Sequence, residues 1–248
     1  MSTETVYNGP IPGLQVPLTI HDLRQGRKYH NELSYGNEDQ DQNHGSHRES
    51  LRQLLEKFEV QDIFGLVDKH KHFDVPQDSH LVGTVGTFRV CPRSLFYLTR
   101  TVADTFSNPN ELCGHKFTYI PGEGLRPYEF RRGPQLEISK VDPELFSQFI
   151  NYLNKHNITS IGLEYIIPQL SQIETHEVVS EEKRWMILIE GALPLNLPNP
   201  IQRVVTSWRW PKSKTISGPA TYCDKDPTGK HVGPDDLPAE IYPMLAQC

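Results

Sequence analysis

The chain contains neither a long apolar run nor a phosphate-binding signature. A membrane-spanning helix needs about 20 consecutive, mostly apolar residues, and no stretch of the 248 residues meets that requirement. The patterns Gly-x-Gly-x-x-Gly and Gly-x-Ser-x-Gly and the protein-kinase signatures are also missing. These absences disfavour a membrane partner, nucleotide-dependent chemistry and serine-hydrolase chemistry.

Cysteine and clustered positive charge are scarce as well. The four cysteines include no Cys-x-x-Cys pair and fit neither a zinc ribbon nor a disulfide framework, so we expect free thiols. The net charge is −6 and the lysines and arginines are scattered, which argues against nucleic acid as a partner. Because the polar N-terminus lacks the basic start and apolar core of a signal peptide, a cytoplasmic location is expected.

Prolines and glycines are distributed along the whole chain, and no internal repeat is present. This distribution fits poorly with a helical bundle or a repeat solenoid. Residues 1–45 are polar and rich in Gly, Asn, Asp and Gln, which predicts a partly disordered N-terminal arm. No break in composition marks a second domain after it, so residues 46–248 are expected to form a single α+β domain.

Two helices are predicted from capping residues that precede apolar stripes. Ser46 and Glu49 form a capping box at the start of a helix over residues 47–59. Asp142 is the expected N-cap of a second helix over residues 142–156. Each helix is expected to pack its apolar face against a sheet.

The remaining elements are predicted from residue type. A shorter helix is expected over residues 94–106, and the Gly- and Pro-rich segment 108–124 is expected to be a long loop. β-Branched and aromatic runs predict further strands over residues 128–130, 159–167, 184–192 and 202–210. Together these elements predict a mainly antiparallel, curved β-sheet packed by two or three helices.

The stretch Asp68-Lys-His-Lys-His-Phe-Asp74 carries the most distinctive side chains. In a strand, alternation places four potential ligands on one face, namely Asp68, His70, His72 and Asp74. Imidazoles and carboxylates held together in this way are typical ligands of divalent Fe, Zn or Cu. An exposed, charged strand without a metal is the alternative interpretation.

We predict that this stretch is the first arm of a β-hairpin. Residues 63–75 and 80–90 are both rich in strand-forming residues, and the segment between them has turn chemistry. Such a hairpin brings His80 beside His72 and Asp74. The candidate metal ligands are therefore His70, His72, His80 and Asp74.

Glu164 lies in an otherwise apolar predicted strand. A carboxylate buried there has to be paired, bind a metal or carry a raised pKa. We therefore include it with His70 and His72 as a candidate catalytic acid or base. Glu190 has similar neighbours but directly precedes Gly191, which favours a strand end open to water.

Two cysteine–histidine pairs and one acidic turn are weaker candidates. Cys113 with His115, and Cys223 with His231, offer nucleophile or ligand chemistry, but neither pair belongs to a recognisable motif, so structural roles are favoured. Residues 224–229 are spaced like the start of a calcium loop but lack its closing Glu, which favours an ordinary turn.

The histidine stretch has two family resemblances. Gly65, His70 and His72 resemble the opening of the cupin metal motif, but no Glu follows His72 at three or four positions. The predicted helices also fit poorly with a pure β-barrel, so we do not assign the cupin family. Residues 64–73 are similar to a Leu-Leu-His-x-His-Phe type segment of short, uncharacterised fungal proteins. This resemblance implies no activity, but it marks His70 and His72 as the working residues.

These observations predict a metal-dependent oxidoreductase or lyase that acts on a small organic molecule, such as a natural-product intermediate. His70 and His72 are expected to bind the metal, and His80 or an acidic neighbour to complete the site. The first alternative is a metal-free isomerase or lyase that uses the same histidines as acid and base. The second is a non-catalytic protein that binds a small molecule in an aromatic concavity formed by Trp185, Trp208, Trp210, Tyr128 and Phe130. Apolar strands near the C-terminus make a homodimer a further expectation.

Overall fold

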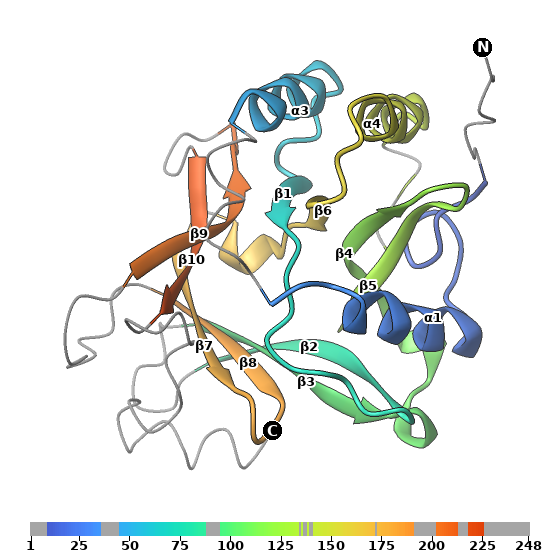
Figure 1. Cartoon of the computed structure of the whole chain (residues 1–248), viewed down its shortest axis with the longest axis vertical. Coiled ribbons are helices and arrows are strands. Elements are labelled where there is room, and N and C mark those ends of the chain that lie inside the picture. The colour runs from blue at the N-terminus through green and yellow to red at the C-terminus, as the bar shows by residue number, and fades with distance from the viewer. Residues whose placement is uncertain are drawn as a thin grey trace.

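The ten strands in the described part of the chain form one closed barrel (Figure 1). This computed structural model describes residues 9–35, 45–87, 95–133, 135, 138, 141–171, 173–190, 202–212 and 218–225. The strands are β1 (Phe64–Asp68), β2 (Ser79–Thr87), β3 (Leu95–Ala103), β4 (Leu112–Ile120), β5 (Gly124–Arg132), β6 (Ile161–Tyr165), β7 (Thr175–Ser180), β8 (Trp185–Glu190), β9 (Gln202–Arg209) and β10 (Gly218–Lys225). Around the barrel their order is β1-β6-β4-β5-β2-β3-β8-β7-β10-β9.

The barrel is closed by β1, which pairs with β6 on one side and with β9 on the other. In the closing pair, Leu66 lies opposite Trp208 and Val67 lies opposite Ser207. The predicted α+β class with a strand-rich core is confirmed, but the strands form a closed barrel rather than the predicted curved sheet. The alternation of apolar and polar residues indicates which face of a strand is buried. It does not indicate which distant strand forms hydrogen bonds with the edge of the sheet.

The predicted β-hairpin is also wrong. Strand β1 ends at Asp68, and β2 pairs with β3 and β5 rather than with β1. The chain after β1 bonds to two loops: the Lys69 N–H donates to the Ser160 carbonyl and the Lys71 N–H to the Ser34 carbonyl. The histidine stretch is therefore a connection that leaves the barrel wall, so its side chains do not follow strict strand alternation.

Two other predictions fail in the first half of the barrel. Residues 94–106 were expected to be helical, and segment 108–124 was expected to be a loop, yet they contain β3 and β4. In β3 the apolar residues at helical spacing are interleaved with strand formers such as Tyr97 and Thr99. Pairing with β2 and β8 on both sides selects the extended conformation.

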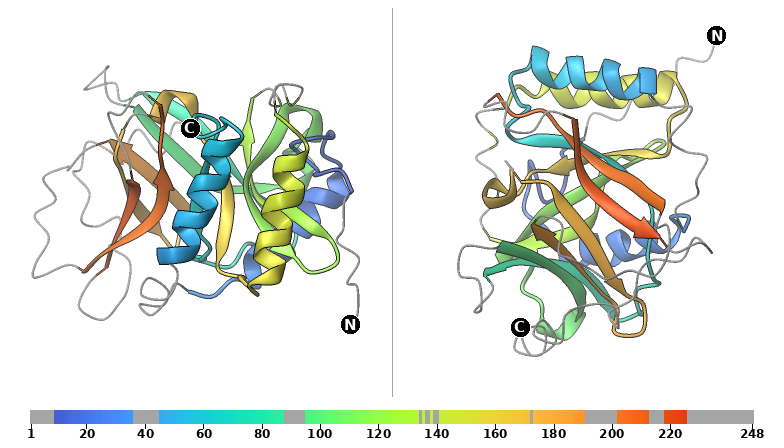
Figure 2. Two further views of the ribbon diagram at one scale, coloured as in Figure 1. Left: turned by 90° about the horizontal axis from the view of Figure 1, so that it is seen from above. Right: turned by 90° about the vertical axis from the view of Figure 1, so that its left-hand side faces the viewer.

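The two predicted helices are confirmed as α3 (Gly45–Lys57) and α4 (Glu144–Lys155). The predicted capping box of Ser46 and Glu49 is wrong, because α3 already includes Gly45 and the Glu49 carboxylate accepts from Arg52 and Gln53. The two helices lie side by side across one outer face of the barrel (Figure 2). Before α4, the Asp142 Oδ1 accepts a hydrogen bond from the Glu144 N–H at 2.9 Å. The two helices are therefore compatible with a barrel, contrary to the prediction, because they cover the barrel from outside.

The segment expected to be a polar arm contains an additional helix, α1 (Ile20–Asn31). A capping box joins the Thr19 and Asp22 side chains to each other's backbone amides at its start. Leu23 is fully buried in a cluster with Phe130 of β5, which attaches the helix to the barrel wall. Most of the predicted mobile loop at 37–45 lies outside the described residues.

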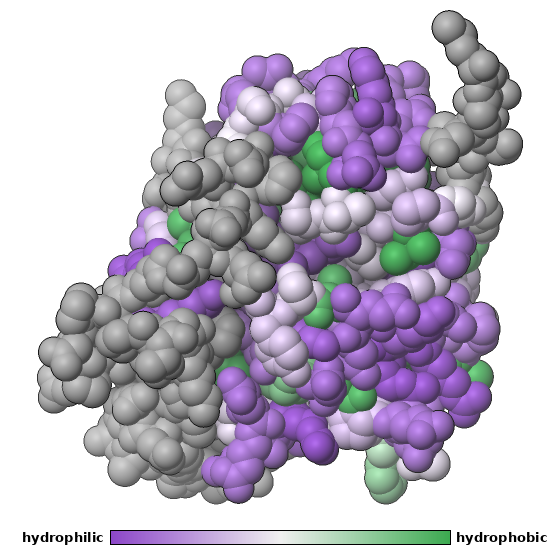
Figure 3. Space-filling model, in the orientation of Figure 1, coloured by the Kyte–Doolittle hydropathy of each residue, from purple (hydrophilic) through white to green (hydrophobic). Residues whose placement is uncertain are grey.

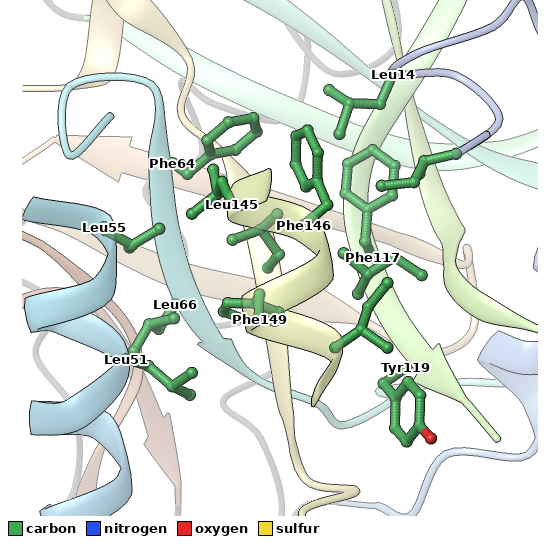
Figure 4. Packing of buried hydrophobic residues seen from close by; sticks show 14 of the residues in the cluster. Leu14, Leu51, Leu55, Phe64, Leu66, Phe117, Tyr119, Leu145, Phe146 and Phe149 are labelled. Carbon is green, nitrogen blue, oxygen red and sulfur yellow. The ribbon is translucent and has the colours of Figure 1, made fainter. Parts of the chain in front are cut away.

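The main hydrophobic core lies between the barrel and the two covering helices (Figure 4). Leu55 of α3 and Phe149 of α4 pack there with Phe64 and Leu66 of β1, and all four are fully buried. Phe64 and Leu66 face outward to the helices. Because side chains alternate between the two faces of a strand, the residues directly after each of them face the barrel interior. This assignment of faces determines which polar residues of the neighbouring strands meet inside.

Gly65 is required where the barrel closes. A Cβ at this position would lie 2.7 Å from the Trp208 carbonyl oxygen of β9, closer than such atoms approach. We expect Gly65→Ala to lower the free energy of unfolding by about 1–3 kcal/mol, because β1 and β9 have to move apart. Urea denaturation measures the change. Gly45→Ala is the control, since an added Cβ there meets no atom within 4 Å; equal denaturation midpoints for both variants would contradict the assigned closure.

No helix in the described segments is both long and apolar enough to span a membrane. Hydrophilic residues predominate on the molecular face shown in Figure 3, where apolar residues form small, separate spots. The large hydrophobic side chains that are exposed among the described residues are Ile20, Tyr35 and Phe106.

Candidate metal centre

Three potential metal ligands meet where the chain leaves β1. The imidazoles of His70 and His72 face the carboxylate of Glu177 from β7, and one ligand atom of each lies within 4.8 Å of the others. The Glu177 Oε2 is 3.7 Å from the His70 Nε2 and 3.6 Å from the His72 Nε2. The two imidazole rings are perpendicular, with centroids 4.6 Å apart. Two nitrogens thus converge on one carboxylate oxygen.

The backbone fixes the proton on His70. Its Nδ1 lies 2.9 Å from the carbonyl oxygen of Asp68. A carbonyl can only accept a hydrogen bond, so Nδ1 carries a proton, and Nε2 is the ring nitrogen that faces Glu177 and is available to bind a metal. Metal-binding histidines are oriented by the same kind of outer hydrogen bond. The hydrogen bond to the Asp68 carbonyl at the end of β1 therefore orients the His70 ring as expected of a metal ligand.

A chain of hydroxyl contacts places Glu177 inside the barrel. Arg209 of β9 faces the interior and contacts the Thr221 hydroxyl of β10, which lies 3.0 Å from the Thr175 hydroxyl of β7. Glu177 is two residues beyond Thr175 in the same strand, so it faces the same side. The side chain of Glu177 is 3% exposed, which shows that its carboxylate is enclosed by the barrel rather than solvated.

Cys223 supports Glu177 from the adjacent strand. The two residues are partners in the parallel pairing of β7 and β10. Burial, assisted by the Glu177 carboxylate, raises the pKa of the Cys223 thiol well above its usual value, and the thiol hydrogen-bonds that carboxylate. At neutral pH Cys223 is therefore a protonated donor that orients Glu177.

The donor set fits a divalent transition metal. Metal–nitrogen and metal–oxygen bonds of about 2.0–2.2 Å place neighbouring ligand atoms about 3.0–3.5 Å apart. The nitrogen–oxygen distances of 3.6 and 3.7 Å need a contraction of only a few tenths of an ångström. Two histidines and one carboxylate are a ligand set of non-haem Fe²⁺ and of catalytic Zn²⁺, and three protein ligands leave positions open for substrate or water.

The interior next to this site is strongly polar. Lys116 of β4 lies 3.2 Å from the Glu129 Oε1 of β5, and both side chains are buried. Burial alone would lower the pKa of Lys116, but the carboxylates of Glu129, Glu177 and Glu164 outweigh it and raise that pKa. Lys116 is therefore a fixed positive charge inside the barrel at neutral pH.

Several buried polar atoms near these charges find no hydrogen-bond partner among the described residues. Four of them belong to interior side chains, namely the Tyr97 hydroxyl, the His115 Nε2, the Glu129 Oε2 and the Arg131 Nε. Buried polar groups are normally satisfied by protein, water or ligand. These buried atoms are therefore positions where water or a polar group of a ligand could bind, although Tyr97 also packs in an apolar cluster with Leu81 and Val179.

Glu164, predicted as a catalytic residue, lies inside the barrel as the partner of Arg209. Its carboxylate oxygens accept from the Arg209 guanidinium at 3.3 and 3.4 Å, and both side chains are almost completely buried. His115 is close by, with Nε2 3.8 Å from the Glu164 Oε1. Burial holds the pKa of His115 well below its usual value, so its ring is neutral and its Nδ1–H donates to the Tyr165 carbonyl.

The structure places the other two predicted ligands away from this group. Asp74 has an exposed side chain and pairs with Lys71 at 2.8 Å. His80 lies on β2, where its Nδ1 is 3.0 Å from Asp104 and its Nε2 is 2.8 Å from the Ser107 hydroxyl. The position that we expected His80 or Asp74 to fill is taken by Glu177.

The His80 cluster has a structural role that pH can test. Burial lowers the pKa of His80, so the neutral ring donates from Nδ1 to Asp104 and accepts from Ser107. Burial opposes ionisation of Asp104, but hydrogen bonds from His80 and Arg24 outweigh it and lower the pKa of Asp104 below 3.8.

We expect Asp104→Asn to lower the free energy of unfolding by about 1–2 kcal/mol at pH 7, because charge-assisted hydrogen bonds are lost. The folded carboxylate has the lower pKa, so its contribution is complete above pH 3.8 and disappears as the pH falls through the folded value. The difference between the two proteins in urea denaturation should therefore shrink below pH 4. A difference that stays constant down to pH 3 would contradict this assignment.

The other residues that the sequence analysis singled out do not belong to the group formed by His70, His72 and Glu177. Cys113 is buried in the outer core and its thiol donates to the Arg131 carbonyl at 3.8 Å. His231 and most of segment 224–229 lie outside the described residues. The aromatic residues proposed as a ligand-binding concavity are divided between clusters: Trp208 packs under Arg48 of α3, whereas Phe130 packs under α1.

Glu177 was not predicted as a site residue. The signal in the sequence is the run Thr175 to Val179, in which a carboxylate occupies one face of a strand rich in β-branched residues. A carboxylate in a predicted buried strand is also the pattern that identified Glu164. Its proximity to the histidines, however, depends on the barrel closing, which is a long-range property.

The fold and the site together define a closed barrel with an internal pair of histidines and a carboxylate that are suited to bind a metal ion. Comparisons with protein-family models, with curated proteins and with solved structures give no significant match for this chain.

Proposed function

We propose that the protein is a metal-dependent enzyme that acts on a small polar organic molecule inside the barrel. A single divalent metal ion would be held by His70, His72 and Glu177, and Fe²⁺ and Zn²⁺ are the ions that this ligand set suits best. One observation carries the proposal: two imidazole nitrogens converge, at 3.6 and 3.7 Å, on one enclosed carboxylate oxygen.

Each neighbouring residue has a definite task in this proposal. A bound metal would activate water or oxygen, or polarise a carbonyl group of the substrate. The Asp68 carbonyl holds the proton of His70 on Nδ1, which keeps Nε2 available. The Cys223 thiol orients Glu177. Lys116 supplies a buried positive charge that favours a substrate with a carbonyl, carboxylate or hydroxyl group.

The polar interior favours an oxygen-rich substrate over a hydrocarbon. The four buried polar atoms without protein partners include donors on Tyr97 and Arg131 and acceptors on His115 and Glu129. A substrate that offers complementary groups satisfies them, whereas an apolar ligand leaves each of them desolvated at a cost of about 1–3 kcal/mol. An oxidoreductase or a lyase acting on such a molecule is the reaction class that we favour.

A metal-free enzyme is the second candidate, and the same distances support it. A histidine about 3.6 Å from a buried carboxylate is also positioned to exchange a proton in an isomerase or lyase. The third candidate, a non-catalytic binding protein, keeps the polar interior but loses its aromatic concavity. A cytoplasmic location, a homodimer and the kinship with short fungal proteins stay predictions beside the proposed function.

Metabolite profiling separates these candidates. The protein is loaded with Fe²⁺ or Zn²⁺, incubated with an extract of small polar metabolites, and the extract is analysed by mass spectrometry. Conversion by the loaded protein, absent after chelation and absent in the His70→Ala/His72→Ala variant, is the expected result. Conversion that survives chelation but not the double variant would support the acid–base enzyme. Depletion without any product would indicate a binding protein, and conversion by the double variant would contradict both enzymatic proposals.

A further inference from the structure

A pocket of about 400 Å³ contains a buried lysine, Lys69, which directly precedes His70 in the chain. It is bounded by the end of α1, the turn between β4 and β5, and the residues that precede β6. Its polar lining includes Glu32, Ser34, Lys69, Thr118, Thr159 and Ser160. The volume is within the range of about 300–1,000 Å³ found for small-molecule sites.

Among the described residues that line the pocket, Lys69 is the only cation, and it is 7% exposed. Its ammonium group donates to the hydroxyl of Thr118, which is 1% exposed. Among the described residues no carboxylate forms an ion pair with Lys69, whereas the similarly buried Lys116 is paired with Glu129. A buried ammonium group without an anion is costly, so a bound anion is the partner that this position lacks.

The exposed part of the pocket lining has different chemistry. Glu32 lines the rim, its side chain is 60% exposed, and its carboxylate lies 4.0 Å from Lys28. A carboxylate repels an anion but accepts hydrogen bonds from hydroxyl groups. Ser34, Thr159 and Ser160 add hydroxyls that both donate and accept. The lining is therefore polarised, with a cation at the buried end and hydrogen-bonding groups toward the rim.

We propose that this pocket binds a small, hydroxylated oxyanion, such as a sugar acid or a sugar phosphate, with its anionic group on Lys69 and its hydroxyls toward Glu32. The carboxylate and the phosphate share the anionic oxygens that a buried ammonium group and the Thr118 hydroxyl recognise. This inference does not depend on metal binding by His70, His72 and Glu177, because Lys69 is not one of those ligands.

Calorimetric titration and thermal unfolding of the full chain with three probes test the inference. Gluconate and glucose 6-phosphate represent the two anionic head groups, and glucose is the uncharged comparison. At least one anion is expected to bind and to raise the melting temperature, and glucose is expected to do neither. The anion that binds more tightly identifies the head group.

Lys69→Met keeps the apolar stem and removes the charge, so affinity for the anion should fall about tenfold or more. Lys212→Met is the matched control, because that side chain is half exposed and lies outside the pocket; it should bind like the original protein. If Lys69→Met does not fold, Thr118→Val, a buried substitution of similar shape, should weaken binding severalfold.

Two results would overturn the inference. One is the absence of binding by both anions to the original protein, and the other is equal binding by the original protein and the Lys69→Met or Thr118→Val variant. Elemental analysis of Lys69→Met measures its metal content, and this shows whether a loss of anion binding is accompanied by a loss of metal binding. An unchanged metal content with lost anion binding assigns two distinct sites.

Discussion

Glu177→Gln is expected to lower the affinity for a divalent metal by at least about 100-fold, so that protein purified without chelator retains only a trace of it. The substitution keeps the size of the side chain and removes the negative charge on the oxygen that lies 3.6–3.7 Å from both histidine nitrogens. Changes even in outer-sphere partners of metal ligands cost about 10–100-fold in affinity, and loss of a charged direct ligand costs more. Elemental analysis per protein chain measures the effect.

The chain provides two matched controls for this experiment. Asp74→Asn removes a carboxylate two residues after His72 whose partner is Lys71. His80→Gln removes a buried imidazole that contacts Asp104 and Ser107. Both variants should keep the metal content of the original protein. Equal metal content in Glu177→Gln and in these controls would show that Glu177 is not a ligand.

Arg209→Met is expected to destabilise the folded protein by about 3–5 kcal/mol, the largest effect on stability that we predict. The Arg209 guanidinium contacts the Glu164 carboxylate, the Leu170 carbonyl and the Thr221 hydroxyl, and it is completely buried. Its loss leaves the Glu164 carboxylate buried beside the neutral ring of His115. Urea denaturation at pH 7 gives the free energy of unfolding.

The double variant Arg209→Met/Glu164→Gln identifies the cause of that loss. If an uncompensated buried charge is responsible, the double variant should be more stable than Arg209→Met alone. Additive losses from the two substitutions would contradict this explanation. Glu164→Gln also tests whether Glu164 takes part in metal binding: a purely structural role predicts an unchanged metal content.

Local sequence signals predicted the parts of the fold that depend on local interactions. Helix α4 was predicted from Asp142 and from apolar residues on one face, and those residues contact the barrel as expected. Strand β3 was missed because Leu95, Leu98 and Val102 also have helical spacing. Only pairing with β2 and β8 on both sides makes the extended form the stable one.

Only the two histidines of the candidate site could be predicted from the sequence, because local signals do not identify distant residues. His70 and His72 are neighbours in the sequence, so their shared chemistry is visible without a structure. Glu177 reaches them because β7 joins β10, β10 joins β9, and β9 closes the barrel on β1. His80 was favoured by a hairpin that does not form, since β2 pairs with β3 and β5 instead. Long-range strand partners leave little trace in one sequence.

Anomalous X-ray diffraction from crystals of the Fe²⁺- or Zn²⁺-loaded protein tests the proposed metal centre most directly. We predict a single strong metal peak inside the barrel, about 2.0–2.2 Å from the Nε2 atoms of His70 and His72 and from a carboxylate oxygen of Glu177. Density without a metal peak at these three residues, or a peak bound only by other residues, would contradict it.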